Sequence, residues 1–385
     1  MKKRKLLMPI FIGLIVGQVF AEGDRPFHIY NTIRFGYTDN VDRTPDGESS
    51  TYVTDTIDFA FNAALSDRTD LLMKSQITLR SDSENDIFPN LYAVLSHQVS
   101  PRLLLSLSEY YKRSEKSTGT KDGRYNYFIN KLGLKATYVL TQKDRLDGSL
   151  DYRIRRHDSE IEAEDSTTIE AGLSWERELI PQRTSVKVNL RERWVDYPET
   201  SPYDWSYEAT EVTLEMAHTL NPSWQTRVEG GFTYVRPDFN TAAVGPDADD
   251  DPRFEPMFKV GVIYSPSPRT RLTGDYSYLY KETDRAPFGA QTSSEFRFGF
   301  QHEITKKVLA KATARFLETE YDQKDNAVGT GGTDEERMDL EFRLTYKLNR
   351  INFLEAGLKY SEVGYDNSDR DWDQTMFDVG WRVEL

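Results

Sequence analysis

Residues 338–348, MDLEFRLTYKL, alternate between apolar and polar side chains without interruption. Successive side chains of a β-strand point to opposite faces of the sheet, so this stretch predicts a strand with one apolar and one charged face. The charged face cannot be a second packed core and must contact water, because unpaired buried charges are very costly. The same alternation recurs at residues 57–65, 186–191 and 296–301, so the stretch is one unit of a repeating pattern.

The connections between these units are of two kinds. Short ones, several with the Pro or Asn that tight turns favour, comprise residues 66–69, 100–102, 142–144, 180–183, 221–223, 265–269, 305–307 and 349–351. Longer polar ones comprise residues 39–51, 81–89, 115–123, 158–165, 198–206, 237–252, 283–290, 320–335 and 366–370. This alternation is typical of outer-membrane barrels, which have short periplasmic turns and long extracellular loops.

We therefore predict an all-β fold, a single transmembrane antiparallel up-and-down β-barrel of about 18 strands (16–18). Aromatic side chains near both ends of the strands would occupy the two lipid headgroup layers. The outer set is Tyr37, Tyr111, Trp194, Tyr280 and Phe316, and the set near the turns is Phe27, Trp175, Trp224, Tyr264 and Tyr346. The alternative is a large soluble β-sandwich or propeller with these aromatics as its core, which predicts no short–long rhythm.

The composition fits a barrel better than a soluble protein. A length of 385 residues would suit two or three soluble domains, yet no linker divides the chain. Only 38% of residues are hydrophobic, below the roughly 45–50% of an ordinary globular protein. Aromatic residues make up 12%, which argues against disorder. A chain that turns every second side chain of its strands to lipid explains both values.

The N-terminus has the pattern of a secretory leader. Basic residues 2–5 precede an apolar stretch, residues 6–20, and Val19-Phe20-Ala21 is a small-x-small cleavage site. We predict a signal peptide over residues 1–21 and a barrel domain over residues 22–385; the alternative is a retained signal anchor. Cleavage would make the chain more acidic than its formal net charge of −14, which argues against nucleic acid as a partner. The predicted location is the outer membrane of a Gram-negative bacterium.

The last residues of the chain carry an assembly pattern. Phe377, Val379, Trp381, Val383 and Leu385 alternate to the terminal residue. Asp378, Gly380, Val383 and Leu385 resemble the β-signal read by the barrel-assembly machinery, although most members of that pattern end in Phe or Trp. A free strand edge can be recognised by strand addition. The expected partners are this machinery, periplasmic chaperones, outer-membrane lipid and lipopolysaccharide.

The stretch Arg34–Val41, RFGYTDNV, resembles the Gly-Tyr-x-Asp-Asn opening of a family of outer-membrane β-barrel porins often associated with exopolysaccharide loci. In a barrel, Asp39 and Asn40 would leave the first strand and enter the first loop, where Asx side chains stabilise turns. The resemblance implies an outer-membrane barrel with a role in transport or export. It supplies no agreed substrate and no catalytic residues.

The charged face of the strands predicts a pore lining. On neighbouring strands this face carries Arg153, Arg155, Lys187, Arg191 and Arg193, with Glu170 between them. One interpretation is a ladder of ion pairs that only supports the barrel. The other is a transverse field across a pore, with an arginine-rich wall that sets ionic preference.

Residues for enzyme chemistry are sparse. The chain has no cysteine, so thiol nucleophiles, disulfides and zinc–thiolate sites are excluded. Its five histidines lack a Gly-x-Ser-x-Gly context or metal-ligand spacing, so we predict no enzyme, no catalytic residue, no metal site and no cofactor. Acidic loop residues could hold calcium or simply remain solvated: Glu160, Glu162, Glu164, Asp165, Asp247, Asp249, Asp250, Asp251, Asp366, Asp369 and Asp371.

Three functions remain open from the sequence. We predict a porin-like passive channel for small hydrophilic solutes, because a barrel of this strand number is wide enough for an aqueous channel. The first alternative is an exopolysaccharide export barrel, in which lumen tyrosines could stack on a polysaccharide; these would be Tyr30, Tyr92, Tyr110, Tyr125 and Tyr127. The second alternative is a structural or surface-interaction barrel with a closed lumen.

Overall fold

The structure is a computed structural model. It describes residues 26–41, 43–81, 87–117, 124–157, 165–197, 205–239, 252–282, 290–321, 334–365 and 371–385. The predicted signal peptide, most of the long connections and most of the acidic loop residues lie outside these ranges. Cleavage after Ala21 and calcium binding therefore stay predictions.

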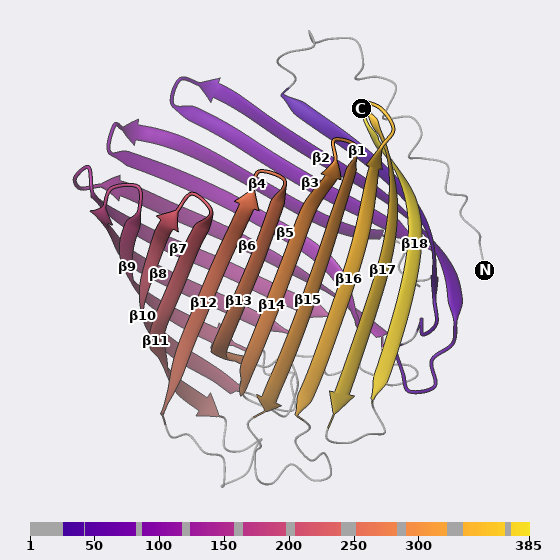
Figure 1. The fold of residues 1–385 in the computed structure, drawn as a ribbon. Coiled ribbons are helices and arrows are strands. Elements are labelled where there is room, and N and C mark those ends of the chain that lie inside the picture. The colour runs from indigo at the N-terminus through magenta and orange to yellow at the C-terminus, as the bar shows by residue number, and fades with distance from the viewer. Residues whose placement is uncertain are drawn as a thin grey trace.

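Every regular element among the described residues is a β-strand (Figure 1). In chain order the strands are β1 (Phe27–Thr38), β2 (Ser50–Ser66), β3 (Thr69–Arg80), β4 (Ile87–Ser100), β5 (Leu103–Ser117), β6 (Arg124–Val139), β7 (Asp144–His157), β8 (Ser166–Ile180), β9 (Thr184–Asp196), β10 (Trp205–Asn221), β11 (Trp224–Phe239), β12 (Arg253–Ser267), β13 (Thr270–Glu282), β14 (Ala290–Thr305), β15 (Val308–Tyr321), β16 (Glu335–Lys347), β17 (Asn352–Tyr365) and β18 (Trp372–Glu384). The described residues contain no helix long and apolar enough to cross a membrane.

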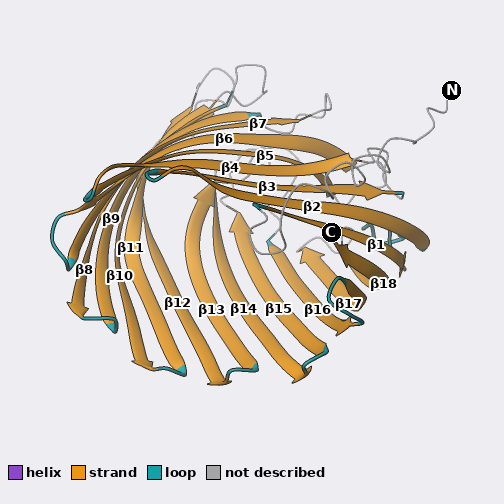
Figure 2. Cartoon of the chain, turned by 90° about the horizontal axis from the view of Figure 1, so that it is seen from above, coloured by secondary structure: helices purple, strands orange, loops and turns teal. Residues whose placement is uncertain are grey.

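Each strand pairs antiparallel with its neighbours in the chain, and the sheet closes on itself. Closure joins β1 to β18, with Tyr30 opposite Glu384 and Thr38 opposite Met376. Figure 2 shows the sheet from above, with β1 beside β18. The predicted fold, an all-β antiparallel up-and-down barrel of about 18 strands, is confirmed: the 18 strands form one closed sheet.

The short turns begin and end within a few residues of the predicted positions. Polar side chains at their first positions accept hydrogen bonds from backbone N–H groups: Thr305 accepts from Val308 at 3.1 Å, and Asn349 accepts from Asn352 at 3.0 Å. The connection expected at residues 265–269 is shorter than predicted, because β12 continues to Ser267 and pairs with Thr270 through a bulge. The bulge adds ladder residues that a period-2 pattern does not show.

The alternation in the sequence corresponds to the two faces of the barrel wall. On β16 the side chains of Leu340, Phe342 and Tyr346 are exposed, whereas Asp339 and Arg343 lie on the other face within ion-pair networks. The exposed aromatics include predicted members of both belts, such as Trp194 near the long-loop end of β9 and Trp224 at the turn end of β11. Trp224 stacks on Tyr264 of β12 with ring centroids 4.1 Å apart.

Candidate functional site: the lumen wall

The strand registers assign each side chain to the outer or the lumen face. The exposed apolar side chains lie opposite other apolar residues on the neighbouring strands. Leu150 of β7 stands opposite Ala171 of β8, and Leu173 of β8 stands opposite Leu190 of β9. The alternate positions of the same strands therefore face the lumen. Polar and charged residues dominate these positions, and several are buried by their neighbours.

All six predicted pore-lining residues lie on the lumen face, on three adjacent strands. Arg153 and Arg155 are on β7, Glu170 is on β8, and the other three are on β9: Lys187, Arg191 and Arg193. Glu170 stands directly opposite Arg193 in the register of β8 and β9. Whether these residues line a conducting pore stays a prediction.

The β9 half of this group is an ion-pair ladder. Glu170 contacts both Arg191 and Arg193, each at 3.2 Å, and Arg191 also reaches Glu211 of β10 at 3.2 Å. Lys187 stands in register between Glu176 of β8 and Glu215 of β10. Opposite charges on neighbouring strands compensate one another here.

The β7 half is held differently. The Arg153 guanidinium donates to the hydroxyl of Thr168 at 3.1 Å, and the Arg155 guanidinium lies over the Tyr127 ring, 5.9 Å from its centroid. These contacts orient the two guanidinium groups on the lumen wall.

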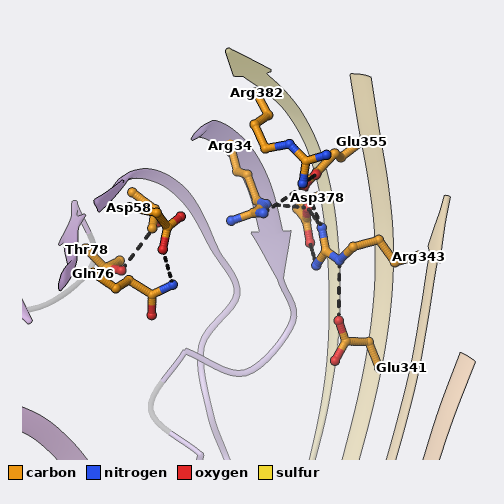
Figure 3. A network of polar contacts seen from close by, with 10 residues as sticks. Arg34, Asp58, Gln76, Thr78, Glu341, Arg343, Glu355, Asp378 and Arg382 are labelled. Carbon is orange, nitrogen blue, oxygen red and sulfur yellow. Dashed lines mark hydrogen bonds and ion pairs between the residues drawn. The ribbon is translucent and has the colours of Figure 1, made fainter. Parts of the chain in front are cut away.

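A second polar network, which the sequence did not predict, spans the closing seam of the barrel (Figure 3). Its centre is Glu355 of β17, whose side chain is 3% exposed. Its carboxylate accepts hydrogen bonds from Arg34 of β1 at 2.8 Å and lies 3.0 Å from Arg382 of β18. Asp378 of β18 accepts two hydrogen bonds from Arg343 of β16, at 3.0 and 3.2 Å. The network thus joins four strands across the seam.

Two glycines make these long-range contacts possible. Gly380 lies in register between Arg34 and Glu355, and Gly357 lies between Arg343 and Asp378. A Cβ on Gly380 would come within 2.8 Å of Cγ of Arg34, and one on Gly357 within 2.6 Å of a carboxylate oxygen of Asp378. Without side chains at these two positions, each arginine can cross one strand to reach a carboxylate two strands away.

The predicted assembly signal therefore has two faces in the folded barrel. Asp378 and Gly380 face the lumen and belong to the seam network, whereas Val383 and Leu385 belong to the outer apolar face of β18. The Leu385 N–H donates to the carbonyl of Ile29 at 2.9 Å, so the terminal residue continues the β1–β18 ladder. Recognition of this stretch by an assembly machinery stays a prediction.

The stretch Arg34–Val41 also serves the seam. The Asp39 carboxylate accepts a hydrogen bond from the Thr375 N–H at 2.6 Å. The Asn40 amide donates to the carbonyls of Thr44 and Asp373, each at 2.8 Å, and its oxygen accepts from the Thr44 N–H. Asn40 thus forms the first loop turn that the sequence predicts and ties it to β18.

The histidines near the short turns share one structural contact. His97, His218 and His302 each place Nδ1 2.9 Å from a threonine hydroxyl on the neighbouring strand. The threonines are the first residues of β3, β9 and β13: Thr69, Thr184 and Thr270. The described residues contain no group of three or more His, Asp or Glu side chains arranged to hold a metal ion.

A family comparison agrees with this architecture. Residues 247–385, which extend from the connection before β12 to the end of β18, match the sequence model of the family described as "Putative beta-barrel porin 2". The resemblance to a family of β-barrel porins is confirmed. The match to this porin family lies in the C-terminal part of the chain and does not include the Arg34–Val41 stretch.

Solved structures share the porin-like fold at low identity. OccK1 (OpdK) from Pseudomonas aeruginosa is 12% identical, with a TM-score of 0.53 over 93% of this chain and 99% of that chain. OpdK with vanillate, also from Pseudomonas aeruginosa, is 11% identical, with a TM-score of 0.52 over the same shares. The FrpB iron transporter apoprotein from Neisseria meningitidis is 10% identical, with a TM-score of 0.51 over 89% of this chain and 62% of that chain.

The chain therefore spans less than two thirds of FrpB but nearly the whole of OpdK. At these identities the likeness shows the fold alone, which is a porin-like β-barrel. The family description and these neighbours' names are those of porins and transporters rather than enzymes. No curated protein sequence matches the chain.

Proposed function

We propose that the chain forms a passive, porin-like channel for small hydrophilic solutes in the bacterial outer membrane. The observation that carries the proposal is a closed 18-stranded barrel whose lumen face carries ion-pair networks from β6 to β12 and from β14 to the seam. Charged side chains need water or partners, and a barrel with this number of strands has room for both. The apolar outer face supplies the matching contact with lipid.

Ion pairs hold many of the lumen charges against the wall. On β14–β16, Glu295 is bound by Arg297 and Arg315, and Asp339 is bound by Arg337 at 2.7 Å. Charges that are compensated along the wall can leave the axis free for solvent. The proposal therefore treats the ladders as support for a water-filled channel, which is how charged walls act in pores.

The test is single-channel conductance of the refolded full chain in planar lipid bilayers. We expect stepwise, voltage-independent conductance that rises with salt concentration. Heat-modifiable migration on a gel would first establish that the barrel is folded. A folded barrel that inserts and gives no conductance steps would refute the channel and favour the closed, structural alternative.

Export of a polysaccharide stays a second candidate. The observation that favours it is the pair Tyr92 and Tyr110, which face the lumen directly opposite each other on β4 and β5. A neutral oligosaccharide that blocks the channel current from one side of the membrane would support this role. The channel proposal also includes the topology: the signal peptide is cleaved, the short turns face the periplasm and the long loops face the outside of the cell.

A further inference from the structure

The lumen charge is unevenly distributed around the barrel, and strands β3–β7 carry its positive excess. The described lumen-facing basic residues of these strands are Lys74, Arg80, Lys112, Lys131, Lys135, Arg145, Arg153 and Arg155. The acidic residues on the same strands and face are Asp70, Asp147 and Asp151. Among the described residues, basic side chains therefore outnumber acidic ones on this wall.

Two of the three acidic residues of this wall form ion pairs with part of the basic set. Asp151 contacts Lys131 at 3.2 Å, and Asp147 contacts Arg145 at 3.2 Å and Lys135 at 3.7 Å. On the neighbouring strand β2, Asp58 accepts a hydrogen bond from Gln76 at 2.8 Å. Lys74 and Lys112 make no ion pair with any residue that the structure describes. Their charges are thus available to the lumen.

On the other side of the barrel, several acidic residues are held in ion pairs. Glu229 of β11 contacts Lys259 at 3.1 Å and Arg227 at 3.9 Å. On β14–β16, Glu295 and Asp339 are each shared between two arginines.

Two tyrosines lie between the uncompensated lysines. Lys74 stands opposite Tyr92, Tyr92 opposite Tyr110, and Lys112 follows Tyr110 by two residues on the same face of β5. Directly opposite side chains on neighbouring strands have Cβ atoms about 5 Å apart, so the four residues form a continuous surface. The side chain of Tyr92 is 38% exposed, so its ring is accessible from the lumen.

We propose that this surface, the basic tyrosine strip of Lys74, Tyr92, Tyr110 and Lys112, binds acidic oligosaccharides. A tyrosine presents a flat apolar face with a polar rim, which suits the alternating C–H and hydroxyl surface of a sugar ring. The lysines are two strands and two residues apart, which is about 12 Å between their backbone positions, so two carboxylates of one oligosaccharide can each meet an ammonium group. This proposal depends on the proposed function in one respect: the ligand must be able to enter the lumen.

The neighbouring arginines do not form part of the strip. Arg153 stands opposite Lys131, which stands opposite Tyr110, and Arg155 stands opposite Ile129, which stands opposite Lys112. Arg153 contacts Thr168 and Arg155 contacts Tyr127. The attraction of Lys74 and Lys112 for a carboxylate should weaken as the salt concentration rises.

The test is equilibrium binding of digalacturonate and of lactose to the detergent-solubilised, folded full chain, measured by titration calorimetry. We expect the acidic disaccharide to bind at least tenfold more tightly than lactose at low salt. The double variant Lys74→Gln/Lys112→Gln should lose about tenfold in affinity for digalacturonate, because two exposed ion contacts are removed. Tyr92→Ala should weaken the binding of both sugars.

The matched control is Lys259→Gln with Arg227→Gln, which removes the same lumen charge from two residues that both contact Glu229. It should change the affinity for digalacturonate by less than twofold. Equal binding of the two sugars, or an equal loss in the control, would overturn the strip. Binding is measured here without conduction, so a barrel that conducts but does not bind refutes the strip alone. A barrel that binds but does not conduct refutes the channel alone.

Discussion

Replacing Glu355 by Gln should weaken the closing seam of the barrel. Its carboxylate lies 2.8 Å from Arg34, 3.0 Å from Arg382 and 3.7 Å from Arg343. The substitution leaves Arg34 and Arg343 with Asp378 as their nearest negative charge and removes the carboxylate that Arg382 contacts. A single charge pair about 4 Å apart near a protein surface interacts by about 4 kcal/mol at an effective dielectric constant of 20. Loss of the attraction between Glu355 and these arginines should therefore be large enough to measure in an unfolding experiment.

Two effects reduce this value. The three arginine side chains are a quarter to a third exposed, so water compensates part of the lost attraction. The glutamine side chain retains a carbonyl oxygen that can still accept one of the arginine hydrogen bonds. Breaking one partner of a fully buried pair costs about 3–5 kcal/mol, so we expect a loss of about 2–3 kcal/mol in the free energy of unfolding.

The matched control is Glu341→Gln, in the same network. Glu341 contacts Arg343 at 3.4 Å, but its side chain is 43% exposed. Exposed pairs contribute about 0–1 kcal/mol, so this variant should unfold almost as the wild type does. The assay is urea unfolding of the refolded barrel in lipid vesicles, with the midpoint and slope compared between variants. A wild-type midpoint for Glu355→Gln, or equal losses in both variants, would refute the reasoning.

Four further predictions concern topology, assembly, selectivity and packing. Cysteines introduced at Gly245 and Gly331 should react with an impermeant maleimide on intact cells and one at Ser223 should not; labelling at Ser223 alone would invert the model of the membrane topology. Leu385→Asp, or deletion of residues 383–385, should abolish heat-modifiable folding, because the terminal residue extends the seam ladder and a charge on the lipid face costs up to a few kcal/mol. Replacing Arg153, Arg155, Arg191 and Arg193 together by Gln should shift the reversal potential in a salt gradient toward cation preference, partly because Glu170 loses its partners; an unchanged ratio in a conducting barrel would make the arginines purely structural. Gly380→Val should lower the urea midpoint of the refolded barrel, because its Cβ meets Arg34, whereas Gly274→Val, with nothing within 4 Å, should not; equal effects would contradict the crossing role of Gly380.

The strands and their faces could be predicted because the signal is local. On β16, the polarity of each residue from 338 to 347 indicates which face of the sheet it occupies, and no knowledge of distant contacts is needed. The residues at which strands end are harder to predict from the sequence. The bulge near Ser267 extends β12 beyond the predicted turn, since polar residues suit both a turn and the end of a ladder.

The seam network could not be predicted in the same way. Arg34 and Glu355 lie on strands separated by β18, and the contact depends on the register across two ladders. A strand pattern states which face a charge occupies but not which residue stands beside it. The sequence marks Asp378 and Gly380 only as part of an assembly signal, because their contacts with Arg343 and Arg34 exist only in the closed sheet.

The β9 ladder shows the intermediate case. The pattern predicted that Arg191, Arg193 and Glu170 share one face, and the register shows that one carboxylate serves both arginines. The basic tyrosine strip, in contrast, cannot be predicted from the strand pattern alone. Lys74 and Lys112 are separated along the chain by β4 and its loop, so their relation to Tyr92 emerges only when three strands are aligned.

The pairing of β1 with β18 also governs how the barrel can form and come apart. Every other ladder joins strands that follow one another in the chain, so each can form as a local hairpin. The seam alone joins residues more than 300 positions apart, and such long-range contacts carry the largest loop-closure cost. We therefore expect the seam to form last and an open, curved sheet to precede it. Once it is closed, no strand has a free edge, so loss of any one strand requires two ladders to break together.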